Sequence, residues 1–198
     1  MSEQPGPARP ESTRDRLFAA AVTAFAAKGF HGTTTRDIAA AAGMSPAALY
    51  VHHRSKEEIL YRISKRGHQN TLALVRAARA SSDDPVAQLR AVVRDFAGHH
   101  ARGHTTARIV NYELSALEEP HLAEIRALRS AIDAEVQGLV AAGVASGAFD
   151  CPDPRVAAAA LLSLGIDIAR WYEDGGGWTP EELGEAYADI AVRIVGAR

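Results

Sequence analysis

The sequence contains one cysteine and no long apolar run, and each of these absences excludes a class of protein. A single cysteine, Cys151, forms no intrachain disulfide, and its place in the turn-like segment FDCPDP argues against a catalytic thiol. No stretch of 18 apolar residues occurs, so no membrane-spanning helix is predicted. The opening MSEQPGPARPES is Pro-rich and polar, typical of a flexible arm over residues 1–11 and unlike a signal peptide. We therefore expect a cytoplasmic protein.

An excess of basic residues is also missing from the chain as a whole, because its formal net charge is −2. The charge is unevenly divided, however. Residues 1–80 carry 12 Lys and Arg against 6 Asp and Glu, whereas residues 81–198 carry 10 against 18. A basic N-terminal part and an acidic C-terminal part predict one domain that faces DNA and one that does not. Uneven solvated helix faces are the alternative interpretation.

Sustained two-residue alternation is absent too, so the sequence predicts an all-α protein without a sheet. After residue 80, three helix starts are marked by a capping residue followed by proline, at Asp84-Pro85, Asp153-Pro154 and Thr179-Pro180. Besides two short helices between Thr34 and His52, we expect helices near 13–28, 56–80, 85–101, 104–117, 120–146, 154–173 and 180–196.

The stretch TTRDIAAAAGMSPAALYVHHRSK, residues 34–56, has the helix-start and helix-end residues expected of a helix-turn-helix. Thr34 and Asp37 have capping-box spacing, and Gly43 stands where a helix ends in a left-handed residue. Ser45 and Pro46 begin a second helix to His52, and Ser55 with Glu58 begins a third. The second helix of such a unit is the one offered to a DNA major groove.

An ordinary helical hairpin has similar spacing, so the residues around the turn decide between the two interpretations. Hydroxyls, a phenol, cations and helix N-termini are the groups that contact phosphate oxygens. The residues of this kind are Thr33, Thr34, Thr35, Ser45, Tyr50, His52, His53 and Lys56.

Other constellations are poor candidates for chemistry. His99, His100 and His104 lack a cysteine or carboxylate that would complete a metal site, and Gly103 interrupts their helix. The glycines at 175–177 have neither the strand nor the spacing of a phosphate-binding loop. We therefore predict no metal, no cofactor and no enzymatic activity. Two other functional classes are the alternatives to this prediction: an enzyme with a DNA-binding head, and an architectural DNA-associated protein.

The segment from TRDRLFAAAVTAFAAKGF through GTTTRDIAAAAGMS to LYVHHRSKEE resembles the N-terminal domain of the TetR family of transcriptional regulators. The resemblance implies an all-helical homodimer of about nine helices, which binds a palindromic double-stranded DNA operator as a repressor and releases it when a small molecule binds. It implies a DNA-binding domain over 12–58 and a ligand-binding and dimerisation domain over 59–198.

The resemblance also assigns roles by position. Thr35, Arg36, Tyr50, His52 and Lys56 are expected to contact the DNA backbone or neighbouring bases. The start of the recognition helix is expected to face base edges; its residues are Ser45, Pro46, Ala47 and Ala48. Because alanines offer only methyl contacts, much of the specificity is expected to come from Arg36, from the N-terminal arm or from DNA shape.

The C-terminal segments VNYELSALEEPHLAEIRALR and LLSLGIDIARWYEDGGGW are similar to regulators of fatty-acyl and steroid catabolism. This similarity implies a hydrophobic acyl effector or an acyl-CoA; another hydrophobic molecule, with a drug-efflux or other metabolic target, is the alternative. Mixed polar and apolar helices predict a pocket between them. Its candidate lining residues, which equally well pack a core, are Phe96, His100, Tyr112, Leu114 and Trp171.

The last two long helices combine large aliphatic residues with alanines, a pattern that permits close packing between two subunits. The residues predicted for this dimer interface are Leu161, Leu164, Ile168, Ile190 and Ile194.

Overall fold

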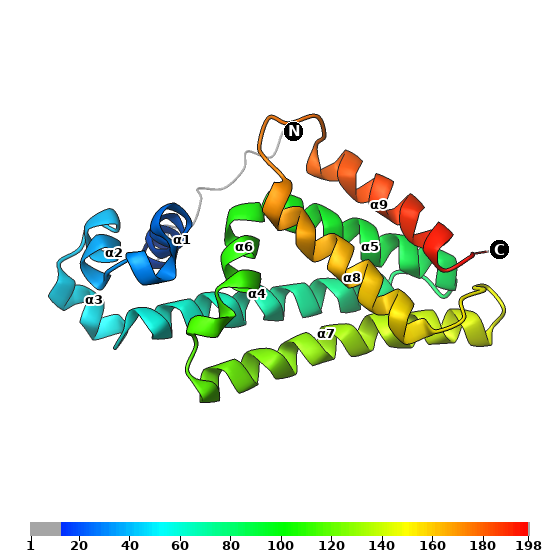
Figure 1. Cartoon of the computed structure of the whole chain (residues 1–198), viewed down its shortest axis with the longest axis horizontal. Helices are drawn as coiled ribbons and strands as arrows, with labels where there is room; N and C mark the ends of the chain where they lie inside the picture. Colours follow the sequence, from blue (N-terminus) through cyan, green and yellow to red (C-terminus); the bar gives the residue numbers. More distant parts are fainter. Residues whose placement is uncertain (1–12, 198) are drawn as a thin grey trace, which may run out of the picture. The chain divides into compact units, whose positions relative to one another are not determined.

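The computed structural model describes residues 13–197, apart from the side chain of His52, so the expected arm at 1–11 lies outside it. Within that range the chain is all-helical and has no strand, as predicted (Figure 1). The helices are α1 (Thr13–Gly32), α2 (Thr35–Ala41), α3 (Pro46–His52), α4 (Lys56–Arg79), α5 (Pro85–Arg102), α6 (His104–Tyr112), α7 (Glu119–Ala145), α8 (Pro154–Trp171) and α9 (Pro180–Ile194), with a 3-10 turn η1 (Leu114–Ala116) before α7.

The largest difference from the predicted boundaries is at 104–117. The α-helix there ends at Tyr112, and η1 takes the place of its last turn. Leu117 and Glu118 then adopt extended backbone angles so that α7 can begin in a new direction, with Pro120 in its first turn. Two later helices end two residues early, α8 because Tyr172 is extended and α9 at Ile194.

A boundary between Leu60 and Tyr61 divides the chain into two compact units, so α4 begins in unit 1 and continues in unit 2. In unit 1, α2 packs against both α1 and α3. Gly29 has a φ of +70°, which ends the regular part of α1 and lets Phe30 fold back onto Phe25 with ring centroids 5.4 Å apart. Gly43 has a φ of +67° in the turn after α2, as predicted. The fully buried core is Leu17, Ala21, Ile38, Ala39, Leu49, Ile59 and Leu60.

In unit 2, α4 and α7 lie side by side and run in the same direction (Figure 1). They are joined near their starts by Lys65–Glu124, at 2.6 Å, and further along by Arg76 and Arg79, both of which pair with Glu135. Helix α5 packs along α9, and α8 contacts α5, α6 and α7. No helix within 13–197 is long and apolar enough to cross a membrane.

Candidate nucleic-acid interface and ligand cavity

The start of α2 is fixed by the predicted capping box. The Thr34 N–H donates to Asp37 Oδ2 at 2.8 Å, and the Asp37 N–H donates to Thr34 Oγ1 at 3.2 Å. Lys28 Nζ adds a 3.0 Å ion pair to the same carboxylate. The Thr34 hydroxyl donates to Asp37 Oδ2 at 2.7 Å, and this bond, followed by those from the Thr34 N–H and Lys28, holds the pKa of Asp37 well below its usual value. The carboxylate therefore stays ionised, and α2 begins in one defined orientation.

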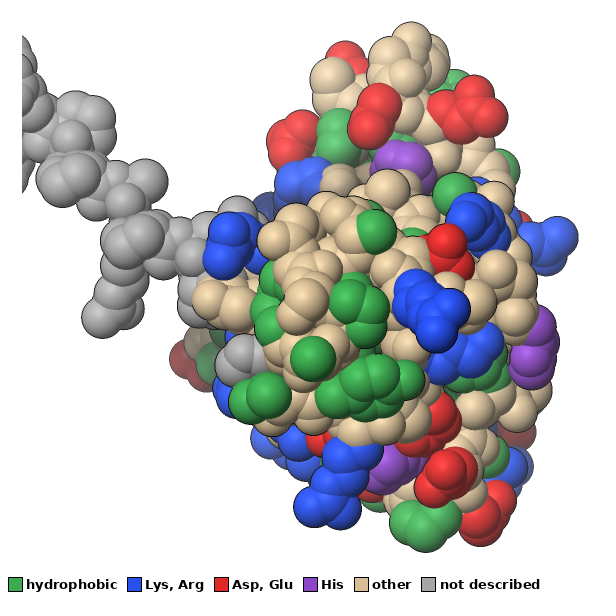
Figure 2. All heavy atoms as spheres, turned by 90° about the vertical axis from the view of Figure 1, so that its left-hand side faces the viewer, with side chains coloured by type: hydrophobic (Ala, Val, Ile, Leu, Met, Phe, Trp, Pro, Cys, Tyr) green, Lys and Arg blue, Asp and Glu red, His purple; other side chains and the backbone are tan. Residues whose placement is uncertain are grey.

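Helix α3 is anchored by one face and leaves the other open. Leu49 is fully buried, and Ser45 caps the helix by accepting from the Ala48 N–H at 3.2 Å. Tyr50 is 53% exposed and Val51 82% exposed, and Ala47 is exposed as well. Figure 2 views the side on which α2 and α3 lie in Figure 1; hydrophobic side chains gather near its centre, next to Lys and Arg side chains. The open face of α3 thus presents small apolar groups.

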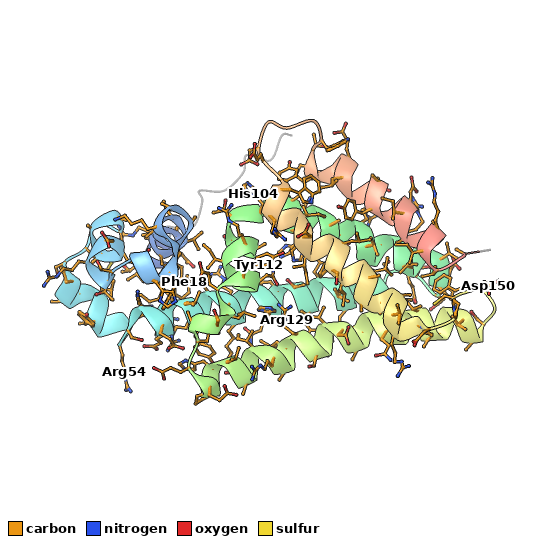
Figure 3. All side chains as sticks on the ribbon, viewed as in Figure 1. Phe18, Arg54, His104, Tyr112, Arg129 and Asp150 are labelled. Carbon is orange, nitrogen blue, oxygen red and sulfur yellow. The ribbon has the colours of Figure 1, made fainter. Side chains whose placement is uncertain are left out.

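Polar groups border this face at the start of α2 and at the turn after α3. The hydroxyls of Thr35 and Tyr50 lie 3.1 Å apart, which links α2 to α3. Arg36 is exposed on α2. Arg54 is also exposed, and its side chain projects away from the ribbon in Figure 3. Its backbone N–H donates to Glu58 Oε2 at 2.8 Å, while Ser55 Oγ accepts from the Glu58 N–H at 3.0 Å.

The sequence prediction of this surface does not include Arg54 and Val51. Their positions indicate it nevertheless, because Val51 lies four residues after Ala47 on the same helical face, and Arg54 directly precedes the cap of α4.

Lys56, predicted to contact DNA, makes its hydrogen bonds inside unit 1. Its Nζ donates to the carbonyl oxygens of Phe30 at 2.8 Å and Thr33 at 2.9 Å, with a longer contact of 3.4 Å to His31. The ammonium also lies 4.4 Å from the centroid of the Phe30 ring. In the structure Lys56 therefore ties the start of α4 to the end of α1.

Two further residues of the predicted set lie in the interior. Thr33 is fully buried, and its hydroxyl donates to the carbonyl of Gly29 at 2.8 Å. His53 is 2% exposed and its ring packs 5.6 Å from that of Phe18, which is labelled in Figure 3. Both side chains are closed off from a ligand on the surface. The side chain of His52 lies outside the described part of the structure.

Unit 2 contains a cavity of about 350 Å³ that α4, α5, α6, α7 and α8 enclose. Its apolar walls include Phe96, Val110, Ile132, Leu162 and Ile166. Its polar residues include His68, Thr71, His100, Asn111, Arg129 and Asp133. The mixture of apolar walls with a few converging polar groups is typical of a small-molecule site.

Arg129 of α7, labelled in Figure 3, is the charged centre of the polar part. Its Nη1 donates to Asn111 Oδ1 at 3.0 Å and lies 3.4 Å from His68 Nε2. Asn111 is held by donating from Nδ2 to the Ala107 carbonyl at 2.9 Å. Burial lowers the pKa of His68, so this ring is neutral at pH 7 beside the guanidinium.

His100 of α5 forms another polar wall and is 4% exposed. Its Nδ1 lies 2.9 Å from the carbonyl of Phe96, and its ring lies 4.3 Å from the Phe96 ring. Burial lowers the pKa of His100 to about 4. The imidazole is therefore neutral at pH 7, with the proton on the nitrogen that faces the carbonyl.

The structure brings two of the five predicted lining residues, Phe96 and His100, to this cavity. Tyr112 is 45% exposed beneath Arg170, and Trp171 is 42% exposed against Trp178. Leu114 lies in η1. None of these three lines the cavity. Leu114 lies beyond the end of α6, Tyr112 is the last residue of α6 with Arg170 over its ring, and Trp171 is the last residue of α8.

The residues predicted for a dimer interface divide into two groups. Leu161 and Ile168 are 5% and 0% exposed in the core of unit 2. The other three, together with Val156, remain exposed on α8 and α9; they are Leu164 (42%), Ile190 (42%) and Ile194 (38%).

Comparisons with known proteins agree with this architecture. The model for bacterial regulatory proteins of the tetR family matches residues 17–63, and the model for the tetracyclin repressor-like C-terminal domain matches residues 82–195. The HTH-type transcriptional repressor KstR2 of Mycolicibacterium smegmatis is 27% identical, over 94% of this chain and 92% of KstR2.

Two solved structures have the same fold. A tetR-family regulatory protein from Rhodococcus RHA1 has a TM-score of 0.89 and 37% identity, covering 94% of this chain and 98% of that one. AibR, solved with isovaleryl coenzyme A and operator DNA, has a TM-score of 0.83 at 23% identity, covering 94% of this chain and all of AibR.

Proposed function

The chain belongs to the TetR family of bacterial regulatory proteins, and on that premise we propose that it is a ligand-responsive transcriptional repressor that binds a palindromic operator as a homodimer. In this proposal residues 12–58 bind DNA, and residues 59–198 bind the ligand and the second subunit. The protein acts in the cytoplasm by binding these partners, without catalysing a reaction. The observation that carries the proposal is the exposed face of α3, with small apolar side chains bordered by hydroxyls and arginines.

That face has the composition needed for a major groove. Ala47 and Val51 offer methyl groups, which suit the C5-methyl of thymine. In our proposal the DNA phosphates are contacted by the hydroxyls of Thr35 and Tyr50 and by the two exposed arginines, Arg36 and Arg54. With Lys56, Thr33 and His53 engaged inside unit 1, we leave them out of the interface.

The second subunit is proposed to cover the exposed aliphatic side chains of α8 and α9. Leu164, Ile190 and Ile194 are large and apolar, and they lose unfavourable water contact when another copy buries them. A dimer also matches the operator we propose, because half-sites about 34–36 Å apart need two recognition helices. Replacing Leu164 by arginine is expected to yield monomers of 21.1 kDa in sedimentation, with tight operator binding lost.

The effector is proposed to be a hydrophobic acyl compound or acyl-CoA bound in the cavity of unit 2. Support comes from the cavity's mixed lining and from the isovaleryl coenzyme A bound to AibR, which shares the fold. Another hydrophobic small molecule, with an efflux or other metabolic target, is the alternative effector.

Selection of bound duplexes from a random pool tests the DNA part. We expect a palindromic consensus, and Arg54→Met should weaken all duplexes similarly and reduce the salt slope by about one. Arg126→Met, at an exposed arginine of α7 paired with Glu119, is the matched control and should leave both unchanged. Recovery of duplexes without any shared sequence would refute sequence-specific regulation and leave an architectural role.

A further inference from the structure

The guanidinium of Arg129 has an unusual set of partners for a charge inside a cavity. Its hydrogen bonds go from Nη1 to two neutral groups, Asn111 and His68. No carboxylate of the described residues pairs with it, and its Nε and Nη2 groups make no hydrogen bond there. A guanidinium with open donors in a cavity is suited to a ligand oxygen, since a charge-assisted hydrogen bond is stronger than a neutral one.

The charge of the whole lining indicates which oxygen this is. Asp133, one turn along α7 from Arg129, is the carboxylate among the lining residues. Asp133 is exposed at the surface, where water solvates its charge, and burial keeps His68 and His100 neutral, so Arg129 is the charged group that a ligand meets farther inside. A free carboxylate would have to give up its own hydration to reach the guanidinium, which is costly. A neutral carbonyl accepts from Arg129 at a smaller desolvation cost.

His100 contributes the opposite kind of group. Because a backbone carbonyl only accepts, the 2.9 Å contact with Phe96 places the ring proton on Nδ1 and leaves a lone pair on Nε2. This Nε2 makes no hydrogen bond within the described part of the chain, although the side chain is 96% buried and lines the cavity. Its complement is a ligand donor, such as a hydroxyl.

The size of the cavity limits how much of a ligand lies inside. Its volume of about 350 Å³ equals that of roughly a dozen waters at ~30 Å³ each, so it holds about a dozen non-hydrogen atoms. An entire coenzyme A thioester is far larger. The exposed lining residues, Ser130 and Asp133 on α7 with Ala159 and Ser163 on α8, place the opening between these two helices.

We propose that the cavity takes the acyl end of a hydroxylated acyl thioester, with the thioester carbonyl on Arg129, the acyl hydroxyl donating to His100 Nε2, and the carrier leaving between α7 and α8. This inference rests on the proposed function, because it assigns a ligand class to the cavity of the same regulator. It assigns the polar contacts to residues on α7 and α5, and it distinguishes hydroxylated from plain acyl groups.

The first test compares four probes on the wild-type protein by calorimetry: 3-hydroxyoctanoyl-CoA, octanoyl-CoA, 3-hydroxyoctanoic acid and free CoA. We expect the hydroxylated thioester to bind best, roughly 2- to 10-fold more tightly than octanoyl-CoA, the range of one neutral hydrogen bond. The free acid tests the carboxylate alternative, and CoA tests recognition of the carrier alone. Tighter binding of the acid than of its thioester, or equal binding of the two thioesters, would overturn the proposal.

Variants then assign each contact. Arg129→Met should weaken 3-hydroxyoctanoyl-CoA about 10- to 100-fold, as expected when a charge-assisted bond is lost, whereas Arg126→Met on the same helix should not. His100→Phe should bring the ratio between the two octanoyl thioesters to about one. Since His100 is buried, the wild-type ratio keeps the test valid if this variant does not fold.

The outcome separates this inference from the regulatory function. Operator affinity without ligand should be the same for wild type and Arg129→Met, because Arg129 lies in the cavity of unit 2. Equal thioester affinity of these two proteins, with sequence-specific DNA binding intact, refutes the assigned contacts and leaves the repressor standing. If the wild-type protein shows no sequence-specific DNA binding, the proposed regulatory function is refuted instead.

Discussion

Replacing Lys56 by methionine should destabilise unit 1 without changing the number of phosphate contacts. Methionine keeps most of the aliphatic stem but removes the ammonium that donates to the carbonyls of Phe30 and Thr33 at 2.8 and 2.9 Å. Hydrogen bonds to charged groups contribute roughly 1.5–3 kcal/mol each, and the carbonyls regain some water when the lysine is gone. We therefore expect a loss of about 2–3 kcal/mol in the stability of unit 1.

Hydrogen exchange of peptides from residues 13–55 measures this loss directly. Both tryptophans, Trp171 and Trp178, belong to unit 2, so fluorescence follows that unit separately. Amides of α1 that exchange through unfolding of unit 1 should exchange about 30- to 150-fold faster in Lys56→Met. Lys28→Met is the matched control, because Lys28 is 54% exposed in its ion pair with Asp37 and should cost less than about 1 kcal/mol.

The same variant distinguishes this structural role from the phosphate contact that the sequence predicts. If Lys56 holds α1, the slope of log affinity against log salt for a nonspecific duplex stays at the wild-type value while exchange accelerates. A slope reduced by about one, with exchange unchanged, would falsify the reasoning and return Lys56 to the interface.

Two further perturbations concern unit 2. The pKa of His100 is about 4 in the folded chain against the usual 6.5, so the unfolded chain takes up the proton first as pH falls. The contribution of His100 to stability is complete above pH 6.5 and should fall by about 2 kcal/mol between pH 7.5 and 5, while His68 and His99, whose pKa values burial also lowers, add to the decline. Urea titrations followed by fluorescence should therefore show a smaller decline in His100→Gln than in the wild type. A Cβ at Gly165 would lie 2.5 Å from Phe96 Cδ1, so Gly165→Ala should cost roughly 1–3 kcal/mol and weaken ligand binding, whereas Gly177→Ala, with open space around it, should do neither; equal melting curves would contradict the clash.

The features that could be predicted from sequence are those set by neighbouring residues. Capping residues such as Thr34 and Ser45 act within one turn of the chain, and Gly43 adopts the left-handed conformation that only its missing Cβ makes easy. The two short helices and the turn between them therefore begin and end as predicted. Glu58 is a small exception, since its carboxylate accepts from the N–H of Arg54, outside the expected cap.

Contacts between distant segments were not predictable in this way. Lys56 looks like a surface cation in the sequence, yet it finds carbonyls 23 and 26 residues earlier, where Gly29 has turned the chain back toward it. Arg129 meets Asn111 and His68 only because α4, α6 and α7 converge, and nothing near it in the sequence marks it. Helical periodicity identifies a buried face but does not name its neighbour.

Helix α8 shows where this limit lies for an interface. Leu161, Leu164 and Ile168 follow one another at intervals of three and four, so they lie along the same side of the helix. Yet Leu161 and Ile168 are buried within the subunit while Leu164 is 42% exposed, since the side chains fan over an arc wide enough to face both the core and the surface. In the sequence, such a helix shows an apolar stripe that is too wide for one neighbouring helix to cover. Which edge of the stripe is buried and which is exposed becomes known only from the packing of α5, α6 and α7 against it.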